Sequence, residues 1–120
     1  MILGIGTDLI ELGRFREVLD RHGSRFLEKL FTDRERAYCG RYRDPLPHYA
    51  GRFCAKEALV KALGGWHSGS WLDFEILSEV SGKPVVVLSE SLQEIVGQGR
   101  LLVTISHSRD YAQAFALWEQ

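Results

Sequence analysis

Residues 48–63 predict a helix that is hard to place anywhere but in a protein core. Apolar side chains such as Phe53, Leu59 and Leu63 occupy several of its faces, so little of its surface is left for solvent. Gly64 and Gly65 follow it, and glycine is the residue expected just past a helix end. We therefore expect this helix to face the core of the domain.

Two charged residues stand one turn apart on this helix. Glu57 and Lys61 have the i, i+4 spacing of an exposed ion pair, which contributes only ~0.2–0.5 kcal/mol. Phe53 lies on the same row, however, and a partly buried charge must be paired or bind something. A metal ion at Glu57 and a phosphate at Lys61 would satisfy both charges. The residues alone leave a surface ion pair and a metal-and-phosphate site open.

The rest of the chain predicts an α+β domain with a largely antiparallel sheet and helices packed on one side. Apolar periodicity predicts helices over 11–22 and 24–30, and a capping box at Thr32 and Glu35 starts a helix that runs to about residue 43. Ser89 is expected to cap another short helix. The predicted strands cover residues 2–10, 71–80, 85–88, 101–105 and 111–118.

The size and composition of the chain support one packed domain over residues 1–120. Hydrophobic residues make up 45% of the 120, enough for a single core. Gly4 and Gly6 in the first strand would let another backbone or a ligand approach it closely. No apolar run reaches the 18 residues of a membrane span, so no membrane partner is expected. Cys39 and Cys54 lack metal-binding spacing, which indicates reduced thiols in a cytosolic protein.

Charge is unevenly distributed along the chain. The net charge of −1 argues against general nucleic-acid binding. The segment from Arg14 to Lys61, however, contains 12 of the 15 Lys and Arg residues and seven acidic residues, a local net charge of +5. This basic half indicates an acidic partner or a phosphorylated ligand, unless it is only a solvated helical surface.

Two further residues are candidates for chemistry. Asp8, near the end of the first strand, could cap the next helix, point to solvent or bind Mg²⁺ together with Glu57, since Mg²⁺ takes one or two protein carboxylates. His107 follows a predicted strand, where it could be a hydrogen-bonded turn residue, a proton acceptor or a phosphate ligand. The other histidines, His22, His48 and His67, have no such context and are interpreted as surface residues. No nucleophile elbow, phosphate loop or dinucleotide fingerprint occurs in the sequence.

Three segments in register resemble the holo-[acyl-carrier-protein] synthases, the small bacterial 4′-phosphopantetheinyl transferases. They are Gly4-Ile5-Gly6-Thr7-Asp8-Leu9-Ile10-Glu11, Arg52-Phe53-Cys54-Ala55-Lys56-Glu57-Ala58 with Lys61-Ala62-Leu63-Gly64, and Ile105-Ser106-His107-Ser108 with Tyr111-Ala112. The resemblance implies the fold of that family. It also implies its reaction, the transfer of the phosphopantetheine arm of coenzyme A to a serine of apo acyl carrier protein in fatty-acid biosynthesis.

The resemblance also assigns roles to residues. Asp8 and Glu57 match the positions that bind Mg²⁺ beside the coenzyme A diphosphate, and Lys61 would pair with phosphate oxygens. Arg52 and His107, with Ser108 beside it, match positions that bind the adenosine phosphates of coenzyme A. Either His107 or a metal-bound water would accept the serine proton.

Assembly and docking follow from the same resemblance. The resemblance implies a cytoplasmic homotrimer with active sites between subunits. It also implies that the acidic carrier protein docks on arginines that match Arg14 and Arg25, with Arg21 as a weaker candidate. The loop 64–70 departs from the family's Gly-Thr-Gly-like loop, so its contacts to coenzyme A are not expected here. Two rival functions are a non-catalytic coenzyme A-binding module and a structural protein that docks acidic partners.

Overall fold

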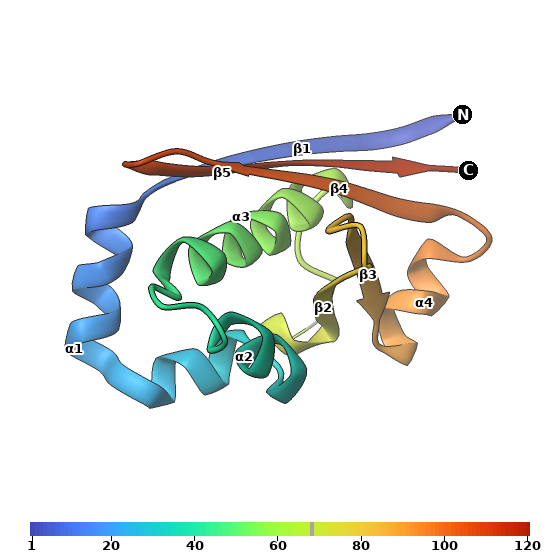
Figure 1. The fold of residues 1–120 in the computed structure, drawn as a ribbon. Helices are drawn as coiled ribbons and strands as arrows, with labels where there is room; N and C mark the ends of the chain where they lie inside the picture. The colour runs from blue at the N-terminus through green and yellow to red at the C-terminus, as the bar shows by residue number, and fades with distance from the viewer. Residues whose placement is uncertain (68) are drawn as a thin grey trace.

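A computed structural model of the chain describes residues 1–67 and 69–120, and over these residues it contains two antiparallel sheets around one long helix (Figure 1). The larger sheet has the strand order β1-β5-β4, and β2 pairs with β3 in the smaller one. The α+β prediction is confirmed, although the expected sheet is divided in two. The strands are β1 (Ile2–Glu11), β2 (Phe74–Ser78), β3 (Pro84–Leu88), β4 (Arg100–His107) and β5 (Tyr111–Glu119).

The helices enclose the inner face of the larger sheet. In Figure 1 α3 lies beneath β1, β5 and β4, with α1 and α2 on its far side. Among the described residues, no helix is both long and apolar enough to cross a membrane. The helices are α1 (Leu12–Leu30), α2 (Asp33–Cys39), α3 (Leu46–Ala62), the short 3₁₀ helix η1 (Trp71–Asp73) and α4 (Glu90–Val96).

Glycine in β1 sets how closely α3 approaches the sheet. A Cβ atom on Gly4 would stand 1.9 Å from the Ala62 carbonyl oxygen, and one on Gly6 would stand 2.0 Å from that of Ala58. Both distances are far inside van der Waals contact, so only glycine fits at these two positions. The close backbone approach expected from the glycines is therefore confirmed, and it places the inner side chains of β1 directly against α3.

Several local predictions need correction. Residues 71–73 form η1 and not the start of a strand, because the Ser70 side chain accepts a hydrogen bond from the Leu72 N–H and closes a turn. Leu72, within the predicted strand 71–80, consequently lies exposed in this turn. Ser89 is the N-cap residue of α4, but its hydroxyl contacts that of Ser91 and makes no capping bond. The capping box of Thr32 with Glu35 is confirmed.

A buried ion pair that the sequence did not reveal joins α3 to its surroundings. Lys56 and Glu35 both have fully buried side chains, with 2.7 Å between Nζ and Oε1. The Lys56 ammonium also donates to the carbonyls of Leu30 (2.6 Å) and Trp71 (3.2 Å). Glu35 in turn accepts from the Ile76 N–H. One network therefore ties the end of α1, α2, η1 and β2 to the central helix.

Candidate functional site

Asp8, Glu57 and Lys61 come together where β1 meets α3. Lys61 Nζ donates to the Thr7 carbonyl at 2.8 Å and lies 3.4 Å from Asp8 Oδ1. Burial is the largest cause that raises the pKa of Glu57, and the nearby Asp8 carboxylate raises it further. Lys61 lowers this pKa and offsets only part of the rise. Two carboxylates held close in a partly buried setting repel one another, so the arrangement favours a bound cation.

The chemistry of this cluster fits Mg²⁺. Asp8 Oδ2 is buried and has no hydrogen-bond partner among the described residues, an orphaned acceptor of the kind that a cation would satisfy. The described residues hold no group of three or more His, Cys, Asp or Glu that could enclose a metal ion. Mg²⁺ does not need such a cage, because it binds through one or two carboxylates and completes its shell with water and phosphate oxygens. Asp8 and Glu57 are the residues that would hold it.

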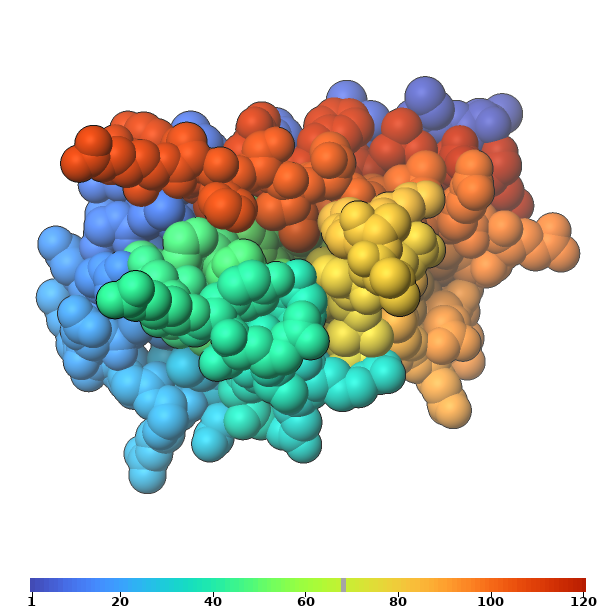
Figure 2. All heavy atoms as spheres, in the orientation of Figure 1, coloured from blue at the N-terminus to red at the C-terminus, as the bar shows by residue number. Residues whose placement is uncertain are grey.

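Arg52 points into a different pocket, on the side of α3 that faces β2 and β4. Its side chain is buried, donates to the Ile76 carbonyl and the Ser78 hydroxyl at 3.1 Å each, and lies over the Tyr38 ring at 4.0 Å. No carboxylate among the described residues forms an ion pair with it. A buried cation without a counter-charge favours an anionic ligand. Figure 2 shows the face on which α2, the β2–β3 turn and β4 come together around this pocket.

Two histidines line the same pocket of about 230 Å³. His107 is the last residue of β4, so it lies within a strand and not after one. His48, interpreted from the sequence as a surface residue, is half-buried, and its ring faces that of His107 edge-on with 5.7 Å between centroids. A signal was present, because His48 precedes Arg52 by one helical turn. Ser108 follows β4 exposed and does not line the pocket.

The two clusters lie on opposite sides of α3. Arg52 and Glu57 are five residues apart, which places them about 140° apart around the helix axis. Asp8 is on β1 and His107 is on β4, the two edges of the sheet, with β5 between them. One chain therefore keeps the carboxylates away from Arg52 and His107. Within one chain this geometry favours a phosphate-binding role for His107 over that of proton acceptor.

The predicted docking arginines all lie exposed on α1. Arg14 and Arg21 are seven residues apart and share one helix face, whereas Arg25 follows the kink at Gly23, whose φ is 64°. Arg14 also lines a shallow depression with Leu9, Glu11 and Tyr111 among others, close along β1 to Asp8. A partner that docks on α1 would thus reach the edge of the carboxylate cluster.

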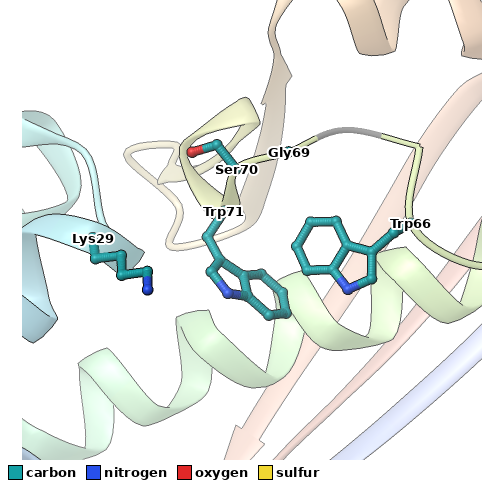
Figure 3. A pocket seen from close by; sticks show the side chains of 5 residues that line it. All are labelled: Lys29, Trp66, Gly69, Ser70 and Trp71. Carbon is teal, nitrogen blue, oxygen red and sulfur yellow. The ribbon is translucent and has the colours of Figure 1, made fainter.

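A third pocket, shown in Figure 3, contains none of the predicted site residues. Trp66 and Trp71 pack edge to face with 4.4 Å between ring centroids, and Lys29 projects toward them from α1. The loop 64–70 was expected not to contact coenzyme A; its residue Ser68 lies outside the described residues. The pocket holds neither the carboxylates nor Arg52, so it is not the candidate site.

Comparison with known protein families gives one consistent result. Residues 4–116 match the model of the 4′-phosphopantetheinyl transferase superfamily. The chain is 49% identical to the holo-[acyl-carrier-protein] synthase of Protochlamydia amoebophila, across 98% of each chain. It is 42% identical to the synthase of the same name from Chlamydia pneumoniae, across 97% of this chain and 96% of that one.

Solved structures agree with the sequence relatives. The crystal structure of holo-[acyl-carrier-protein] synthase from Neisseria meningitidis superposes with a TM-score of 0.91 at 31% identity, across all of both chains. The enzyme from Bacillus anthracis in complex with CoA (3′,5′-ADP) superposes with a TM-score of 0.83 at 34% identity, across 98% of this chain and 96% of that one.

Proposed function

The chain belongs to the 4′-phosphopantetheinyl transferase superfamily, and we propose that it transfers the 4′-phosphopantetheine arm of coenzyme A to a serine of apo acyl carrier protein. The products are holo acyl carrier protein and adenosine 3′,5′-bisphosphate, and the reaction serves fatty-acid biosynthesis. One observation carries the proposal: Asp8 and Glu57 face each other beside Lys61, and the buried Asp8 Oδ2 lacks a partner within the described residues.

The residues present suit this chemistry. The serine Oγ gives up its proton to His107 or to a water molecule and attacks the phosphorus that bears the pantetheine arm. A new O–P bond forms, and the bridging O–P bond to the adenosine 5′-phosphate breaks. Such a reaction needs positioning and charge neutralisation more than covalent help from the protein. Mg²⁺ bound at Asp8 and Glu57 would neutralise charge on the diphosphate. Lys61, more than half exposed, is free to pair with the phosphate oxygens, and Arg52 and His107 bind a second phosphate group.

An exposed apolar sheet face supports a homotrimer with active sites between subunits. The outer face of the β1-β5-β4 sheet exposes Ile5 (60%), Leu9 (63%) and Phe115 (40%), together with Leu102. An apolar surface of this kind marks an interaction site. A neighbouring subunit packed nearby would also bring its Arg52 and His107 toward the carboxylates of this chain. Such an assembly would account for the separation of the two clusters across α3.

The exposed arginines of α1 support docking of the acidic carrier protein. Arg14, Arg21 and Arg25 form no ion pairs within the part of the chain that the structure describes. Complementary charge of this kind mainly sets the encounter rate and the register of the partner. The two free, buried thiols of Cys39 and Cys54 support a cytoplasmic, reducing environment.

The test is to incubate the protein with apo acyl carrier protein, coenzyme A and Mg²⁺ and to measure the mass of the carrier. We expect the carrier to gain one phosphopantetheine group, and Asp8→Asn or Glu57→Gln to abolish the gain while the fold is retained. A chelator should also stop the reaction, and added Mg²⁺ should restore it. A folded protein that binds coenzyme A but never modifies a carrier would instead be a binding module, and the proposal would be wrong.

A further inference from the structure

His48 stands in the Arg52 pocket in a way that no role assigned so far explains. Its ring stacks on that of Tyr42, with 3.5 Å between centroids and 16° between planes, and presents itself edge-on to His107. Tyr42 is itself held by Tyr38, with 2.8 Å between the two hydroxyl oxygens. Stacking fixes the plane of the His48 ring, while no hydrogen bond to its ring nitrogens is found among the described residues.

His48 lies close to a buried positive charge, the Arg52 guanidinium. Arg52 lies one turn along α3 and His107 lies opposite on β4, and both lower the pKa of His48 in addition to burial, which is the largest cause. The Asp44 carboxylate, in the turn that precedes α3, raises the pKa of His48. A pocket that gathers a buried guanidinium and two imidazoles gains most from a ligand group that carries more than one negative charge.

The size of the pocket limits what it accepts. Its volume of about 230 Å³ lies below the ~300–1,000 Å³ typical of sites that enclose a whole drug-sized ligand. It therefore suits one group of coenzyme A. The diphosphate is assigned to the carboxylate cluster with Lys61, which leaves the 3′-phosphomonoester. A phosphomonoester carries a charge of about −1.5 to −2 near pH 7, so it matches a pocket that contains the Arg52 guanidinium and two imidazoles.

We propose that His48 is a specificity-determining residue that, with Arg52 and His107, selects ligands carrying the 3′-phosphomonoester of coenzyme A. This inference rests on the proposed function for the identity of the ligand. Tyr42 holds the imidazole in place at the wall of the pocket, where a ring nitrogen can donate a hydrogen bond to a phosphate oxygen.

The experiment compares the binding of coenzyme A and 3′-dephospho-coenzyme A by calorimetry, in the presence of Mg²⁺. His48→Phe keeps an aromatic ring to stack on Tyr42 but removes both nitrogens, and His48→Gln keeps a donor without the ring. His22→Gln is the control, because His22 lies exposed on α1, away from the pocket. Thermal unfolding of each variant checks that the fold is intact.

We expect His48→Phe to weaken binding of coenzyme A by about tenfold or more, the value of one charge-assisted hydrogen bond. Binding of 3′-dephospho-coenzyme A should stay unchanged, and His22→Gln should alter neither. Equal losses for both ligands, or no loss for either, would overturn the role of His48. If no coenzyme A binds to the unaltered protein and no carrier is modified, the proposed function itself fails.

Discussion

The two lysines that flank Glu57 should respond in opposite ways to the same substitution. Lys56 is fully buried and Lys61 is more than half exposed, although they lie five residues apart on α3. Methionine has a similar length and no charge, so Lys56→Met and Lys61→Met form a matched pair. The first tests the buried network around Glu35, and the second tests the phosphate-binding role of the exposed ammonium.

The structure gives the magnitude for each variant. Lys56→Met removes three hydrogen bonds and leaves the buried Glu35 carboxylate without its counter-charge. Loss of one partner from a buried ion pair costs about 3–5 kcal/mol. Lys61→Met removes only a contact of 3.4 Å to Asp8 and one hydrogen bond to the Thr7 carbonyl, both at the surface. An exposed pair contributes about 0–1 kcal/mol, so Lys61→Met should barely change the free energy of unfolding.

Urea unfolding at a fixed protein concentration measures the difference, because the stability of the proposed homotrimer would depend on that concentration. Carrier modification should follow the reverse order: Lys61→Met should lose transfer activity while it stays fully folded. Adding Glu35→Gln to Lys56→Met should recover part of the lost stability, since it removes the buried charge left unpaired. Equal destabilisation by both lysine substitutions would refute the division into a structural and a phosphate-binding residue.

Three further outcomes are expected. Gly6→Ala should lower the unfolding free energy by about 1–3 kcal/mol or more in urea unfolding, because its Cβ would meet the Ala58 carbonyl oxygen at 2.0 Å; an unchanged midpoint would contradict the packing of β1 on α3. Leu9→Glu should convert an assembly of three 13.6 kDa chains into monomers in light scattering, because it charges the exposed sheet face. Burial raises the pKa of Cys39 to about 12, so the native protein should not react with thiol reagents at pH 8. The pKa of an unfolded thiol is ~8.5. The contribution of the buried thiol to the free energy of unfolding is therefore fully present below that pH and is lost as the pH rises above it.

The elements of the fold were predictable where the signal is local. The core helix, the capping box at Thr32 and the close approach at Gly6 each depend on a few neighbouring residues, and all three are found. The 3₁₀ turn at Leu72 was not predictable, because a single side-chain bond from Ser70 overrides the strand-like alternation. Division of the sheet also depends on pairing between distant segments, which alternation alone does not specify.

The site divides along the same line. The residues alone allowed Asp8 and Glu57 to bind one metal ion if the strand and the helix were adjacent, but they did not show that adjacency. The glycines of β1 indicated only a close approach by some backbone or ligand. The burial of Lys56 could not be foreseen, because its partner Glu35 lies 21 residues away and Lys56 stands beside Glu57 like an ordinary surface charge. His48 was misread because its contacts Tyr42 and His107 come from other parts of the chain, although its place one turn before Arg52 was a local signal.

The position of α3 between the two clusters leads to a test of the proposal that the active site is shared between subunits. Glu57→Gln disables one cluster and Arg52→Gln the other, so each variant alone should be inactive. If each site takes its carboxylates from one chain and Arg52 from the next, trimers assembled from both variants contain some sites with two intact halves. In a cyclic trimer assembled at random from equal amounts of the two variants, about one quarter of all sites have both halves intact. Mixed and reassembled protein should then recover about one quarter of the normal transfer rate. Sites contained within single chains would recover none, and that result would refute the assignment of the two clusters to neighbouring subunits.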